Sequence, residues 1–127
     1  MKTIAKIEND FRSELGSIAD KFEVFELSVA DARTSDAQYV WHPGVYVWWH
    51  PSKGPVKVGR HLTNSRKRAL EHIGANTGGV LASLGSDSST KLLLFNVRNP
   101  EDRHWVAAIE IYFETVLDPS VPSDRLG

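Results

Sequence analysis

Residues 44–73 decide how this chain folds, and they have the sequence GVYVWWHPSKGPVKVGRHLTNSRKRALEHI. Their first part consists of two segments rich in valine or aromatic residues, separated by the turn sequence PSKGP at residues 51–55. Such segments on either side of proline and glycine are typical of an antiparallel β-hairpin. We therefore predict strands over residues 45–50 and 56–60.

A basic helix is predicted directly after the hairpin. Thr63 or Asn64 can cap its first turn, and the helix should continue to about Ile73. Arg68 and His72 are four residues apart, so they would lie one above the other on one face of this helix. The hairpin and the helix could therefore gather polar side chains on one concave surface.

Alternation along the first strand divides its side chains between the two faces of the sheet. One face should carry Val45, Val47 and Trp49, and the other Tyr46, Trp48 and His50. The expected pairing puts Lys57 of the second strand on the Tyr46 face. An ammonium near a phenol favours the phenolate, so Lys57 would lower the pKa of Tyr46 and make it a better base.

The rest of the chain supplies further helices and strands. We identify these elements from the spacing of apolar residues, from a helix start at Asn99–Pro100 and from the apolar run before that start. We expect helices over residues 3–15, 77–84 and 100–117, and strands over residues 22–29 and 91–97. Residues 30–38 and 119–127 are expected to be irregular.

These elements predict an α+β fold, an α/β sandwich in which helices flank a small, mainly antiparallel central sheet. We expect one domain over residues 1–127, because the chain is long enough for one core but not for two. Its parts would be an N-terminal helix-and-strand extension over residues 1–40, the core over residues 41–117 and a C-terminal tail over residues 118–127.

The composition is that of an ordinary globular protein, with 41% hydrophobic and 24% charged residues. The longest apolar run, Leu92–Phe95, is too short to span a bilayer. Glu8, Asp10 and Glu14 interrupt any apolar run of a signal peptide near the N-terminus. The chain has no cysteine, which excludes disulfides and thiolate zinc sites. We expect a cytoplasmic protein.

The charge is unevenly distributed. The net charge is −1, which argues against a generally basic nucleic-acid binder. From His50 to His72, however, six lysines and arginines face one acid, Glu71, whereas residues 1–37 have five basic and eight acidic residues. A local positive patch on a neutral body suits an anionic ligand, although a solvated basic helix would look the same.

Four motifs in order resemble those of the GIY-YIG nucleases. Gly44-Val45-Tyr46 stands in the place of the first motif, and Lys57-Val58-Gly59 follows after ten residues in the place of the second. Residues 64–73 look like the arginine-bearing helix of that family, and residues 107–113, which contain Glu110, look like its later helix with a glutamate. The resemblance covers roughly residues 44–117.

The resemblance implies a small antiparallel sheet with helices around it and metal-assisted cleavage of DNA. Tyr46 would then act on the attacking water, and Arg68 would steady the negative charge that develops on the phosphate. His72 would assist proton transfer or bind phosphate. Glu110 would hold one divalent ion, Mg²⁺ or Mn²⁺.

Two features depart from the family pattern. Lys57 replaces the second tyrosine, which suggests altered or weakened chemistry. The interval from Gly59 to Arg68 is about one residue longer than expected, so Arg66 is a rival for the arginine role. Glu114, one turn after Glu110, is the nearest substitute for the glutamate.

Glu110 also attracts attention without the family, because a carboxylate among apolar neighbours is costly to bury unpaired. A bound Mg²⁺ would remove that cost, as would exposure or a salt bridge with an arginine. If DNA binds, Trp48 on the Tyr46 face could stack on a base, although a core position is the commoner role for tryptophan. The basic side chains expected to contact backbone phosphates are Arg60, Arg66 and Lys67.

Two functions follow from the sequence. The first is a metal-dependent endonuclease that hydrolyses DNA phosphodiester bonds, with Tyr46, Lys57, Arg68, His72 and Glu110 at its site. The second is a GIY-YIG-like domain with weakened or lost catalysis, which binds nucleic acid or a protein partner through its basic face. The sequence leaves the oligomeric state open, and cutting both strands of a duplex would need a dimer or successive nicks.

Overall fold

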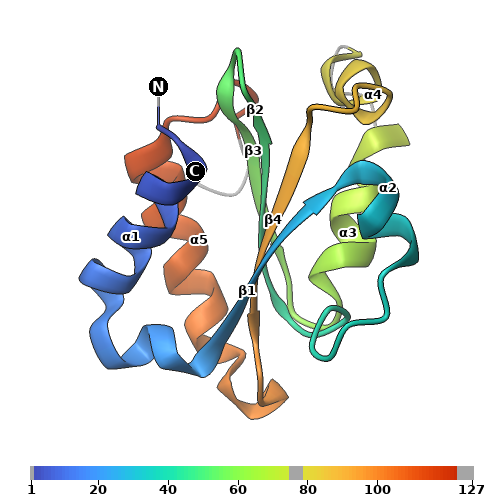
Figure 1. Ribbon diagram of the computed structural model, residues 1–127. Coiled ribbons are helices and arrows are strands. Elements are labelled where there is room, and N and C mark those ends of the chain that lie inside the picture. The colour runs from blue at the N-terminus through green and yellow to red at the C-terminus, as the bar shows by residue number, and fades with distance from the viewer. Residues whose placement is uncertain (1, 75–78, 123–127) are drawn as a thin grey trace.

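The computed structural model describes residues 2–74 and 79–122. They form one four-stranded antiparallel sheet with helices on both faces, which confirms the predicted α+β class (Figure 1). In chain order the elements are α1 (Ile4–Leu15), η1 (Gly16–Lys21), β1 (Phe22–Ser28), α2 (Val29–Thr34), β2 (Gly44–His50), β3 (Gly54–His61), α3 (Ser65–Glu71), η2 (His72–Gly74), α4 (Val80–Gly85), β4 (Lys91–Val97), η3 (Pro100–Asp102) and α5 (His104–Leu117).

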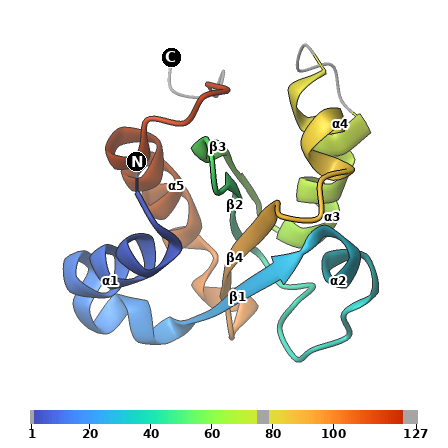
Figure 2. The same ribbon diagram turned by 45° about the horizontal axis from the view of Figure 1, so that its top comes forward.

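The strand order in the sheet is β1-β4-β2-β3. The last strand in the chain, β4, is therefore inserted between β1 and the hairpin, which explains why Lys91–Val97 is apolar at almost every position. Strand β3 has a neighbouring strand on one side only and forms an edge of the sheet. Helices α1 and α5 cover one face of the sheet, and α2, α3 and α4 cover the other (Figures 1 and 2).

The two faces have separate apolar cores, and strand β2 contributes to both. Val45 and Val47 pack with residues of α1 and α5, whereas Tyr46 and Trp48 pack with residues of α2, α3 and α4. This division is the alternation that the sequence predicted. Phe11 of α1 contacts three other phenylalanine rings, so the N-terminal helix is part of the first core.

Some elements differ from the sequence prediction. The segment expected to be a loop after β1 begins with the helix α2, whose N-cap Ser28 accepts a hydrogen bond from the backbone of Asp31. The predicted helix start at Asn99 is instead a 3-10 turn, and α5 begins at His104. The predicted helix before β4 starts at Val80 in the described part, and its expected first residue, Thr77, lies outside the described residues.

The tail after α5 is not irregular throughout. Val121 forms a bridge with Lys57 and donates its backbone N–H to the Val56 carbonyl at 2.7 Å, so the tail runs along the free side of β3. Residues 123–127 of the predicted tail lie outside the described residues. Among the helices of the described segments, none combines the length and the apolar character needed to cross a membrane.

Candidate active site at the edge of strand β3

Tyr46 lies across the edge strand, directly over Gly59. The two residues are opposite each other in the β2–β3 ladder, and a Cβ atom at position 59 would collide with the ring and the hydroxyl of Tyr46. The tyrosine is only 2% exposed. The absence of a side chain at Gly59 is therefore what allows the phenol to reach the β3 edge.

His72 packs against Tyr46 from the end of α3. The centroids of the two rings are 5.6 Å apart, with an interplanar angle of 42°. Asn64 caps the other end of α3, because its side chain accepts a hydrogen bond from the backbone of Lys67 at 3.0 Å. Ser65 and Ala69 of α3 are buried on the side that faces the sheet, and His72 continues that side. The structure therefore brings the predicted phenol and imidazole together.

The two arginines considered for the phosphate role point in different directions. The Nη1 atom of Arg66 donates to the Ser35 carbonyl at 2.5 Å, so Arg66 is directed towards the end of α2. Arg68 is two residues further on, roughly 200° around the helix, on the flank that also carries His72. Its nearest carboxylate is Glu71, at 3.5 Å. The geometry thus favours Arg68 over Arg66 as the neighbour of His72.

Glu110 is bound by Arg60 of strand β3. The Arg60 Nη1 atom donates to the Glu110 Oε1 atom at 2.8 Å, and Glu110 is 1% exposed. Arg60 is opposite Val45 in the ladder, so its side chain points to the α5 face. The salt bridge with an arginine, one of the alternatives considered from the sequence, accounts for the buried carboxylate. Arg60 thus neutralises Glu110, a role different from the expected phosphate contact.

Lys57, which the sequence placed beside Tyr46, is bonded to the C-terminal tail. Its Nζ atom donates to the Pro122 carbonyl at 3.3 Å, and its charge acts on Glu114. The ladder between β2 and β3 changes register between Trp48 and Trp49, next to Lys57. Such bulges redirect side chains, which explains why strict alternation placed this ammonium wrongly.

Trp48 is not available for base stacking. It is 1% exposed, and its indole Nε1 atom donates to the Ala69 carbonyl of α3 at 3.3 Å. The prediction that Trp48 contacts nucleic acid is therefore wrong, because its ring fills the core between the sheet and α3. Lys67, in contrast, is exposed on α3, where a phosphate could reach it.

Glu114 is a second buried carboxylate of α5, near Glu110. It lies one turn after Glu110 and is 8% exposed, and its Oε1 atom accepts no hydrogen bond from any described residue. Burial, followed by the charge of Glu110, raises the pKa of Glu114, whereas Lys57 lowers it. Carboxylate oxygens are the ligands that Mg²⁺ and Mn²⁺ prefer, so the predicted divalent ion would have to fit between these two side chains. Residues 2–74 and 79–122 contain no group of three or more potential metal ligands, so the fit depends on these two.

The phenol and the carboxylates lie on opposite faces of the sheet. Tyr46 belongs to the core beneath α2, α3 and α4, whereas Ile109, next to Glu110, belongs to the core beneath α1 and α5. Both groups nevertheless reach neighbouring residues of one edge strand, since Tyr46 lies on Gly59 and Glu110 is bound to Arg60. A site that uses both must therefore open at the edge of β3.

The chain matches no protein-family model, no curated protein and no solved structure. The resemblance to the GIY-YIG nucleases thus stays a prediction from the quoted motifs.

A second polar cluster, which the sequence did not indicate, joins the end of β2 to the loop before β4. The His50 Nε2 atom lies 2.7 Å from the Asp87 Oδ2 atom, and His50 Nδ1 accepts from the Ser52 backbone at 3.1 Å. Ser89 donates to Asp87 from its backbone and from its hydroxyl, at 2.9 and 2.6 Å. These bonds lower the pKa of Asp87 to about 2. The two bonds from Ser89 have the larger effects, and the bond from His50 has a smaller one. His50 and Asp87 are 37 positions apart, and this separation hides their contact in the sequence.

This depressed pKa predicts how stability responds to acid. Asp87 stabilises the fold fully above its ordinary pKa of 3.8, and the contribution is lost as the pH falls through about 2. Urea unfolding between pH 5 and pH 2 should show a smaller loss of stability for Asp87→Asn than for the wild type. Asp36→Asn, which changes an exposed loop carboxylate, should follow the wild type. Parallel curves for all three proteins would contradict the role of Asp87.

Proposed function

We propose that the protein is a metal-dependent endonuclease of the GIY-YIG type, which hydrolyses phosphodiester bonds in DNA at the edge of strand β3. One observation carries the proposal. A phenol packed against an imidazole and a carboxylate bound by a guanidinium arrive, from opposite faces of the sheet, at the adjacent residues Gly59 and Arg60.

Hydrolysis of a phosphodiester requires an activated water molecule and neutralisation of charge on the phosphate oxygens. Tyr46 is buried, so its hydroxyl can act only on a molecule at the β3 edge, where it would orient the attacking water and accept its proton while passing the phenolic proton to His72. His72, packed on the same ring, would take that proton onwards or donate to the phosphate. Arg68, on the flank of α3 that carries His72, can offer two parallel N–H bonds to the phosphate.

Glu110 and Glu114 would hold the divalent ion. When bound, that ion supplies positive charge that polarises the phosphate and its water. Arg60 fixes the position of the Glu110 carboxylate, because its Nη1 atom donates to the Glu110 Oε1 atom at 2.8 Å.

The second candidate is a binding module with the same fold and weakened catalysis. Lys57 favours it, since the residue in the place of the second tyrosine is bonded to the C-terminal tail. Such a module would bind DNA or another partner through α3 without cutting it.

A nicking assay on supercoiled plasmid with Mg²⁺ or Mn²⁺ separates the two candidates. The wild type should nick, and Tyr46→Phe should be slower by about a hundredfold, because loss of a positioned acid–base group typically costs that much or more. Glu110→Gln, which keeps the volume of the side chain, should be slower to a similar extent.

Two matched variants control for the substitutions themselves. Tyr112→Phe removes the hydroxyl of a half-buried tyrosine of α5 that donates to the Asp10 carbonyl of α1, and Glu101→Gln removes the charge of an exposed carboxylate of η3. Both should nick like the wild type. Nicking that is unchanged by Tyr46→Phe and Glu110→Gln would overturn the proposal, and DNA binding without nicking by the wild type would establish the module.

A further inference from the structure

A cationic groove is lined by residues of α2 and α3. It has a volume of about 430 Å³. Its lining residues are Arg33, Asn64, Arg66, Lys67, Leu70 and Glu71. Arg33 comes from α2, in the N-terminal part of the chain, outside the stretch that resembles the nucleases.

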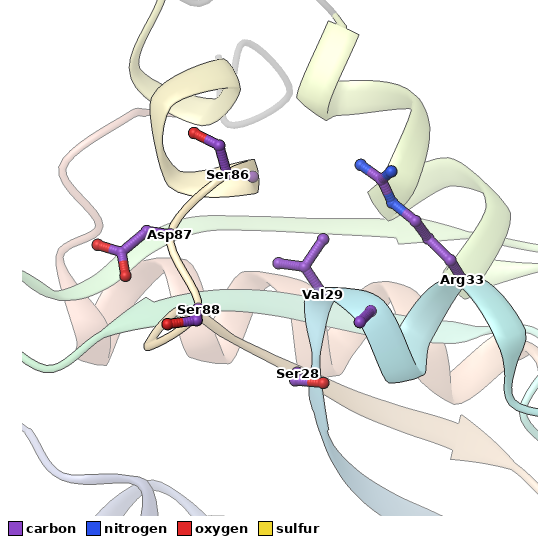
Figure 3. Close-up of a pocket in the computed structure, with 8 residues that line it drawn as sticks. Ser28, Val29, Arg33, Ser86, Asp87 and Ser88 are labelled. Atoms are coloured by element: carbon purple, nitrogen blue, oxygen red, sulfur yellow. The ribbon is translucent and has the colours of Figure 1, made fainter.

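Arg33 also lines a neighbouring hollow between α2 and the loop that precedes β4. This second hollow has a volume of about 360 Å³ and includes Ser86, Asp87 and Ser88. In Figure 3 the Arg33 guanidinium extends from α2 on the side of α3, and the Asp87 carboxylate points away from it. Asp87 is instead bonded to His50 and Ser89. Arg33 thus stands where two hollows meet, and the acid of the second hollow does not neutralise it.

The groove carries an excess of positive charge. Within the described part of the chain, neither Arg33 nor Lys67 forms an ion pair, and both are exposed. Arg66 is bonded to a neutral carbonyl, so its charge is not cancelled by a carboxylate there. Glu71, the one acid in the lining, is the carboxylate nearest to Arg68.

We propose that this groove binds the phosphate backbone of a nucleic-acid strand, with Arg33 and Lys67 contacting phosphates on either side of it. The choice of nucleic acid as the polyanion rests on the proposed function, whereas the cationic groove itself does not. Lys67 and Arg68 are adjacent residues of α3 and point about 100° apart around the helix axis. The phosphates held by Arg33 and Lys67 would therefore be neighbours of the phosphate at Arg68, and they would anchor the strand without sequence readout.

Fluorescence anisotropy with a fluorescein-labelled 20-base-pair duplex in EDTA tests the groove without any cleavage. Arg33→Ala and Lys67→Ala should each raise the Kd roughly threefold to tenfold at low salt. Each should also make the slope of log K against log salt shallower by about 1, because one phosphate contact is lost. Arg12→Ala, which removes an exposed helical arginine from α1 on the other side of the sheet, should change neither quantity.

If Arg33→Ala and Lys67→Ala both keep the wild-type Kd and salt slope, the groove does not bind phosphates. This holds even if the protein nicks plasmid. The expected shifts in a protein that does not nick would support the groove while the proposed nuclease function fails. Polyglutamate that competes as well as unlabelled duplex would overturn the assignment to nucleic acid in favour of an acidic polypeptide partner.

Discussion

Gly59→Ala is expected to abolish detectable nicking and to lower the free energy of unfolding by about 3 kcal/mol. The added methyl group would occupy the space of the Tyr46 ring and hydroxyl, and neither is a flexible chain end that can move aside easily. The ring is held between the sheet and His72, so relieving the collision requires the strand or the tyrosine to shift. Either shift separates the phenol from the imidazole.

A double-mutant cycle with Tyr46→Ala checks this origin of the effect. Once the ring is gone, an alanine at position 59 loses the collisions with its three nearest atoms, all of which belong to Tyr46, so its cost should fall below about 1 kcal/mol, and the two substitutions should be strongly non-additive. Urea unfolding gives the four free energies. If Gly59→Ala costs the same free energy of unfolding in both backgrounds, the glycine is needed for the backbone of the strand and not for the space of the Tyr46 ring.

Asn96→Ala is expected to lower the free energy of unfolding by about 3–5 kcal/mol. Asn96 is completely buried in β4, and its Oδ1 atom accepts from the Ser65 hydroxyl at 2.5 Å. Its Nδ2 atom donates to the carbonyls of Tyr39 and Val40 at 2.9 and 3.2 Å. Alanine would remove the partner of the buried Ser65 hydroxyl and the donor to the Val40 carbonyl, and it would leave the Tyr39 carbonyl with the backbone N–H of His42 alone.

Two variants show whether burial is the reason. Asn99→Ala removes an exposed asparagine that only caps η3, and it should cost about 1 kcal/mol. Ser65→Ala removes one member of the network and should cost less than Asn96→Ala, because the two carbonyl bonds remain. Guanidinium unfolding measures all three. A cost for Asn96→Ala no larger than for Asn99→Ala would rule out the network as a major source of stability.

Local sequence patterns were sufficient for most of the fold. The hairpin followed from alternation around a proline–glycine turn, and α3 followed from Asn64, which caps it as predicted. The buried character of β4 followed from its uninterrupted apolar run. Helix α2 was missed because only Val29 and Ala32 of its six residues are buried, which is too few to give an amphipathic pattern.

The candidate site was predictable only in part, because its contacts join distant residues. The meeting of Tyr46 and His72 follows from the hairpin and the adjacent helix, whose relation is local. Fifty residues separate Arg60 from Glu110, and no periodicity connects them. The bulge that redirects Lys57 is a property of the strand pairing, so the alternation rule failed at that residue.

The C-terminal tail has a further consequence for how the protein behaves at high concentration. An edge strand offers unpaired backbone groups to which another chain can add, and self-association often begins there. Along β3 the backbone of Ser120 and Val121 already occupies the carbonyls of Pro55 and Val56. At the opposite edge, the exposed Glu26 of β1 places negative charge that repels a second copy of the same strand. The two borders of the sheet thus resist aggregation by different means, one by occupancy and the other by repulsion.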